Sequence, residues 1–209
     1  MKSKESVFER TYEDYLARLA QLNLQGLEDV LGVQVDGDVV IVTLYGRLYR
    51  VSTGGIQDPF GKRPPLDICV ILSKYLLMCP PEEPAGREWI SYKDFRDSGP
   101  LTTYFSHDVE QAIADRFAGR PGQLQKASED LGGLAPEIEA IYDLSVRFQA
   151  LPRVPVLMLF NDRDEEFGAT CSVLLERCAD RYLDPESLAV LGRLLFTYLK
   201  KRVENAIGS

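Results

Sequence analysis

The chain has a single histidine, His107, among its 209 residues. Metal sites built from several imidazole ligands, and the His-Glu-x-x-His proteases, need more than one histidine, so this sequence excludes them. An enzyme with a histidine base would have to use His107 in that role. This residue lies off the apolar face that Leu101, Phe105 and Val109 predict for a helix. A solvated helical histidine is the simpler interpretation.

Closely spaced cysteine pairs are also missing. The four cysteines are Cys69, Cys79, Cys171 and Cys178, and none of them forms a Cys-x2-Cys pair. The spacing therefore does not resemble a zinc ribbon or an iron–sulfur motif. Their mostly apolar neighbours are typical of buried structural thiols.

Positive charge is scarce, since 24 Lys and Arg stand against 32 Asp and Glu, a net charge of −8. An acidic chain without a long basic stripe lacks the electrostatic basis of nucleic-acid binding. No apolar stretch approaches the roughly 20 residues of a membrane span. Residues 1–20 carry charges throughout and contain no apolar segment of the secretory type. We therefore expect a cytoplasmic protein that binds neither nucleic acid nor membrane.

The composition itself is that of a soluble globular protein, with 45% hydrophobic and 27% charged residues. A chain of this length can bury a substantial core, and we expect a single domain over residues 1–209. Glycine-rich breaks between two predicted helices mark 119–135 as the candidate subdomain boundary.

Amphipathic helices are predicted at both ends of the chain. Apolar residues recur at helical spacing over 8–22. Asp184 as N-cap and Pro185 in the first helical position begin a C-terminal helix with an apolar face over 188–199. A further helix over 66–78 is apolar almost all round, which predicts a central, buried position.

Strands are predicted in two blocks. The first block, 33–51, reads as an antiparallel meander with a hairpin turn at Asp36-Gly37. The second contains a strictly alternating stretch, a continuous apolar stretch and a third strand, over 142–148, 156–160 and 170–176. Helices are also expected over 101–117 and 123–131. Because helices and strands occur in blocks, we predict an α+β fold in which helices pack against an antiparallel or mixed sheet.

An acidic loop directly follows the continuous apolar strand. Carboxylates at the end of a central strand are typical of sites for hard cations, which prefer oxygen ligands. The candidate ligands for Mg2+ or Ca2+ are Asp162, Asp164, Glu165 and Glu166. The alternative is a solvated loop, because exposed carboxylates repel one another only weakly in water.

A second candidate site combines aromatic and polar side chains in one short segment. Aromatic walls with a few polar groups are typical of small-molecule pockets. The candidate ligand-binding residues are Trp89, Ser91, Tyr92, Lys93, Asp94 and Phe95. The alternative is an edge strand whose aromatic side chains belong to the core.

The sequence also resembles a known family. The resemblance is carried by Leu159-Phe160-Asn161, Asp164 to Phe167, Val173 to Glu176, Ala179, Tyr182-Leu183 and Leu188 to Gly192, together with Trp89 to Phe95. These residues resemble an uncharacterised bacterial and archaeal family, common in anaerobes and known only as a domain of unknown function. Relatives with attached iron–sulfur segments imply a link to anaerobic redox or corrinoid metabolism. This chain has Gly168 where the family has proline.

Two functional hypotheses follow. The first is a small-ligand-binding or accessory protein whose pocket lies between the 89–95 segment and the acidic loop. The second is an enzyme that uses Mg2+ or Mn2+ at Asp162 and Asp164, with Lys93 holding a phosphate or another anion of the substrate. A structural, partner-binding subunit is the third possibility, and a large exposed apolar patch would indicate it.

Overall fold

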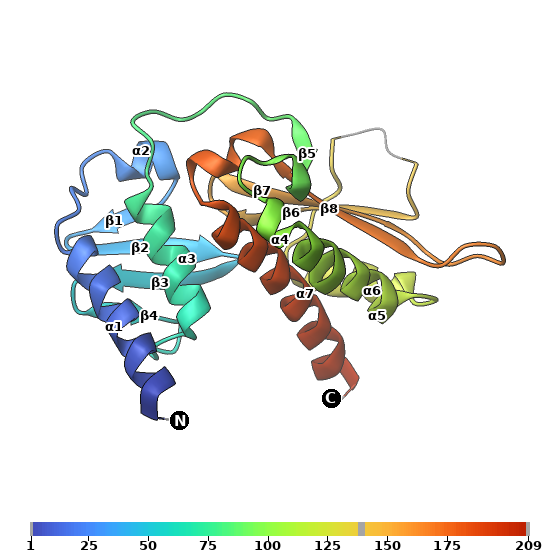
Figure 1. Ribbon diagram of the computed structural model, residues 1–209, viewed down its shortest axis with the longest axis horizontal. Coiled ribbons are helices and arrows are strands. Elements are labelled where there is room, and N and C mark those ends of the chain that lie inside the picture. The colour runs from blue at the N-terminus through green and yellow to red at the C-terminus, as the bar shows by residue number, and fades with distance from the viewer. Residues whose placement is uncertain (1, 138–140, 208–209) are drawn as a thin grey trace.

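The computed structural model describes residues 2–137 and 141–207 and contains helices together with two antiparallel sheets (Figure 1). Each sheet has four strands, in the orders β1-β2-β3-β4 and β5-β8-β7-β6. The α+β prediction is confirmed, and so are the helices at the two ends of the chain. The strands form two sheets, where a single one was expected.

The first sheet is the predicted meander. Its four consecutive strands are β1 (Gln34–Asp36), β2 (Val39–Leu44), β3 (Arg47–Ser52) and β4 (Gly55–Gln57). The first turn is Gly37-Asp38, one residue later than predicted. The turn between β2 and β3 is Tyr45-Gly46, with φ values of 47° and 74°. Positive φ at both positions suits the twist of a two-residue hairpin.

Three helices belong to the first sheet: α1 (Lys2–Leu19), α2 (Leu27–Leu31) and α3 (Leu66–Leu77). α1 packs against α3, and the Tyr12 hydroxyl accepts a hydrogen bond from the Ile56 N–H of β4 at 2.9 Å. α3 lies between α1 and α7 (Pro185–Ile207), with its residues largely buried from Ile68 to Leu76. The prediction of a central helix is confirmed.

The second sheet consists of β5 (Trp89–Ser91), β6 (Leu144–Leu151), β7 (Val154–Asn161) and β8 (Thr170–Glu176). β7 is an inner strand, and every residue from Val154 to Phe160 is buried. This burial on both faces confirms the interpretation of the continuous apolar stretch.

Helices cover one face of the second sheet. They are α4 (Gly99–Phe105), the π-helical segment η2 (Ser106–Gln111), α5 (Ala112–Phe117), α6 (Pro121–Asp130) and α7. Asp184 caps α7, since its Oδ1 accepts the Ser187 N–H at 2.9 Å. The His107 side chain is 79% exposed, as expected for a solvated position. Within the described part of the chain, no helix has the length and apolarity needed to cross a membrane.

Two short 3-10 segments complete the described elements, η1 (Tyr92–Asp94) and η3 (Arg177–Arg181). All four cysteines are free; Cys69 and Cys178 are buried, whereas Cys79 and Cys171 are partly buried. Burial raises the pKa of the Cys69 thiol to about 11. Burial also raises the pKa of the other three thiols, so all four favour the protonated form.

The two sheets are joined by a contact at the Tyr45 turn. The Tyr45 N–H donates to the Ala150 carbonyl of β6 at 2.8 Å, and its hydroxyl donates to the Leu191 carbonyl of α7 at 2.9 Å. Buried residues of both sheets form one continuous core. The chain passes from one sheet to the other through residues 78–88, which we call the linker, whereas 119–135 lies among the helices of the second sheet.

Candidate ligand-binding site

The segment 89–95 contributes its two largest buried rings to the core. Tyr92 stacks on Phe105 with ring centroids 4.4 Å apart, and its hydroxyl donates to the Pro185 carbonyl at 2.9 Å. Phe95 is 5% exposed and packs at an angle against Tyr92. These contacts correspond to the alternative in which the aromatic side chains belong to the core.

The other predicted residues of this segment lie elsewhere. Trp89 and Ser91 are half-buried on the edge strand β5, where they pair with Glu176 and Leu174. Lys93 and Asp94 are exposed in η1. The six side chains are divided between the core, the strand and solvent, and a ligand-binding role for them stays a prediction.

The acidic loop uses its aspartates to hold backbone N–H groups. Asp164 Oδ1 accepts from the N–H groups of Phe167 at 2.7 Å and Glu166 at 2.8 Å. These bonds lower the pKa of Asp164, the one from Phe167 most. Asp162 Oδ1 accepts from the N–H of Gly119 at 2.6 Å, which joins the loop to the end of α5. Asp164 thus caps the backbone of the loop itself, whereas Asp162 anchors the loop to a distant part of the chain.

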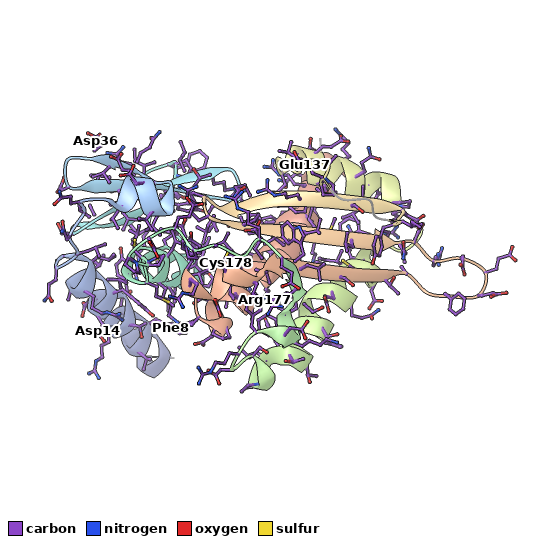
Figure 2. The ribbon with its side chains drawn as sticks, turned by 90° about the horizontal axis from the view of Figure 1, so that it is seen from above. Phe8, Asp14, Asp36, Glu137, Arg177 and Cys178 are labelled. Carbon is purple, nitrogen blue, oxygen red and sulfur yellow. The ribbon has the colours of Figure 1, made fainter. Side chains whose placement is uncertain are left out.

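The structure does not bring the two predicted segments into one pocket. β5 pairs only with Leu174 to Glu176, at the C-terminal end of β8, whereas the loop 162–169 precedes Thr170 at the other end. Figure 2 shows this loop extending beyond the strands. Strand β5 and the loop therefore lie at opposite ends of β8, and a pocket shared by the two segments stays a prediction.

The metal prediction for Asp162, Asp164, Glu165 and Glu166 stays a prediction. Glu165 and Glu166 are exposed in the loop. Across residues 2–137 and 141–207, no group of three or more His, Cys, Asp and Glu side chains has an arrangement that fits a metal ion.

A groove of about 580 Å³ lies between α1, α3 and α7. Apolar side chains line it from all three helices: Phe8 and Tyr15 from α1, Leu66 and Val70 from α3, and Val190 from α7. Figure 2 labels Phe8, which is 50% exposed. The volume lies within the roughly 300–1,000 Å³ that is typical of small-molecule sites.

Charged side chains at this groove are paired with one another. Lys74, whose side chain is only 18% exposed, lies 2.6 Å from Asp184 and 3.9 Å from Glu186. Asp67 lies 2.6 Å from Arg193. Burial alone would raise the pKa of Asp184, but hydrogen bonds from Lys74 and Ser187 lower it below its ordinary value. The groove thus presents apolar walls beside satisfied charges, with Glu186 exposed at its edge.

No pattern in the sequence indicates this groove. The spacing of Phe8, Tyr12, Tyr15 and Leu19 predicts one apolar helix face, and Tyr12 and Leu19 are indeed buried. Phe8 and Tyr15 instead line the groove. Helical spacing cannot distinguish a covered aromatic residue from one that lines a cavity, because the opposite wall comes from a distant part of the chain.

Residues 23–198 match the model of the family described as Domain of unknown function (DUF3786). No curated protein and no solved structure matches the chain. The match includes the 89–95 segment, the acidic loop and the α3 and α7 residues that line the groove; α1 precedes it. Since this match covers most of the sequence and agrees with the family resemblance found there, the chain belongs to the DUF3786 family.

Proposed function

We propose that this protein binds a small organic molecule in the groove between α1, α3 and α7. The observation that carries the proposal is the groove itself, with its volume of about 580 Å³ and apolar walls from three helices. Concave, mostly apolar sites with a few polar groups are the usual form of ligand pockets.

The charges of the groove define the class of ligand. Lys74 is occupied by Asp184 at 2.6 Å, so its ammonium is not available to attract an anion. The Glu186 carboxylate, 77% exposed and 3.9 Å from Lys74, is an available acceptor. A molecule with an apolar body and an amino or other hydrogen-bond-donating group fits this arrangement best, because burying an anion beside Glu186 is unfavourable.

The probe N-phenyl-1-naphthylamine has these properties and fluoresces more strongly in apolar surroundings. We expect saturable fluorescence enhancement with the wild-type protein. Val70→Trp and Val190→Trp each place a large ring in the groove and should weaken binding about tenfold or more, since the ring occupies the ligand's space. Leu48→Trp is the control, because Leu48 is 55% exposed on β3, outside the groove.

Circular dichroism and thermal unfolding show whether each variant is folded. Equal binding by the wild type and both groove variants would place the probe elsewhere and contradict the proposal. Absence of saturable binding to the wild type would contradict it as well.

A further inference from the structure

A second cavity, of about 240 Å³, lies where the linker passes the second sheet. Five charged side chains line it: Glu83 and Arg87 from the linker, Arg147 from β6, Arg153 from the β6–β7 turn, and Glu176 from β8. We call it the arginine cavity. It carries an excess of positive charge in a protein whose net charge is −8. Figure 2 labels Cys178, which also lines it, near the linker.

The strand residues of the cavity come from the outer face of the second sheet. Arg147 pairs with Leu157 and Gln149 with Pro155, whereas the alternate residues Phe148 and Val156 are buried on the other face. The arginine cavity is therefore formed by the strands on one side and the linker on the other. Glu83, Arg87 and Gln149 are exposed, so small solutes can reach it.

Arg153 is held in place by the first half of the molecule. Its Nη2 donates to the Asp29 carbonyl at 2.8 Å and its Nε to the Val30 carbonyl at 3.3 Å, close to the C-terminus of α2. A cation is favourable at this end of a helix. Its backbone N–H donates to the Tyr75 hydroxyl at 3.0 Å. These bonds fix one guanidinium at the wall of the cavity before any ligand arrives.

One carboxylate bridges two of the arginines. Glu83 lies 3.4 Å from Arg87 and 3.3 Å from Arg153, distances longer than those of a strong charge-assisted hydrogen bond. Arg147 donates to the amide oxygen of Gln149 at 3.1 Å. Among the residues that the structure describes, no carboxylate lies within 4.0 Å of Arg147. The guanidinium N–H groups in the cavity thus lack short hydrogen bonds to carboxylates.

We propose that the arginine cavity binds a small oxyanion, either a phosphate group or a carboxylate group, and that Glu83 is the resident counter-ion which this anion displaces. Planar guanidinium groups donate paired hydrogen bonds to either kind of anion. The arginine cavity shares no lining residue with the groove between α1, α3 and α7. The proposal for the cavity therefore does not depend on the function proposed above.

Calorimetric titration with inorganic phosphate and with succinate, at constant ionic strength, tests this site. We expect saturable binding of at least one of the two, and the comparison distinguishes a phosphate ligand from a carboxylate ligand. Arg147→Gln should weaken binding about tenfold, because it removes a charged donor. The control is Arg50→Gln on β3, which removes the same charge from an exposed position outside the cavity.

Glu83→Gln should tighten binding roughly threefold, since it removes a competing charge from an exposed ion pair. Glu82→Gln, on the same linker but outside the arginine cavity, should leave it unchanged. Absence of saturable binding to both anions, or equal weakening by Arg147→Gln and Arg50→Gln, would overturn the site. Tight binding by the wild type that Glu83→Gln does not improve would overturn the role of Glu83 as resident counter-ion.

Discussion

The groove between α1, α3 and α7 and the arginine cavity use charge in opposite ways. At the groove, Lys74 and Asp184 are 2.6 Å apart and partly buried, so their charges largely cancel. In the arginine cavity, Glu83 lies more than 3 Å from both of its partners. A matched pair stabilises the fold and leaves binding to apolar contacts, whereas an unmatched set of cations is available to a ligand.

The largest effect expected from this contrast is on stability. Asp184→Ala removes both the N-cap of α7 and the partner of Lys74, and should lower the free energy of unfolding by about 2–3 kcal/mol. Urea unfolding measures this loss of stability. Glu186→Ala, which removes an exposed carboxylate 3.9 Å from Lys74, should cost less than about 1 kcal/mol. Equal losses in the two variants would mean that the Lys74–Asp184 pair stabilises the fold no more than an exposed ion pair does.

A smaller loss is expected at the junction that holds Arg153. The Tyr75 hydroxyl donates to the Leu31 carbonyl at 2.6 Å and accepts the Arg153 N–H. Tyr75→Phe leaves both groups without this partner and should cost about 1–3 kcal/mol in thermal or urea unfolding. Tyr15→Phe, on the half-buried wall of the groove, is the control and should be nearly neutral. A neutral Tyr75→Phe would show that the junction does not depend on this hydroxyl.

The ligand affinities of the two sites should depend differently on salt concentration. Raising NaCl from about 0.05 to 0.5 M shortens the screening length several-fold. Phosphate affinity in the arginine cavity should therefore fall by about tenfold, while the affinity of the naphthylamine probe for the groove should hardly change. Parallel titrations at both salt concentrations measure this difference. A similar loss at both sites would contradict the distinction between apolar and electrostatic recognition.

The smallest expected effect is on stability at low pH. The pKa of Asp184 is lowered in the folded protein from an ordinary value of 3.8. A lowered folded-state pKa gives stability that is present above the unfolded value and is lost as the pH falls through the folded one. Below about pH 4, the wild type should thus lose stability more steeply than Asp184→Asn. Unfolding curves between about pH 2 and 6 measure the slopes, and identical slopes would contradict the pKa shift.

Short-range patterns predicted most elements of the fold. The apolar stretch 156–160 became the inner strand β7, and Asp184 with Pro185 began α7 as expected. The π-helical turns at Ser106–Gln111 were not predicted, since their sequence has the spacing of an ordinary helix. Local sequence is informative where hydrogen bonds and side-chain contacts form between near neighbours.

The candidate sites were harder to predict. Trp89 to Phe95 and the acidic loop were chosen for their composition, yet the pairing of β5 with the end of β8 separates them. Neither the groove nor the arginine cavity has a continuous motif. Phe8 and Val190 both line the groove, and Arg87 and Arg147 both line the arginine cavity, although the two members of each pair lie far apart in the chain.

The sequence by itself determined the class of the fold, its family, most helices and strands, and the exposure of His107, because periodicity, caps and turns act over a few residues. Tertiary structure alone decided that the strands divide into two sheets, that Tyr45 joins them, and that two cavities form where helices and the linker meet. These features depend on contacts between residues far apart in the chain, whose pairing follows from the packing of the whole core.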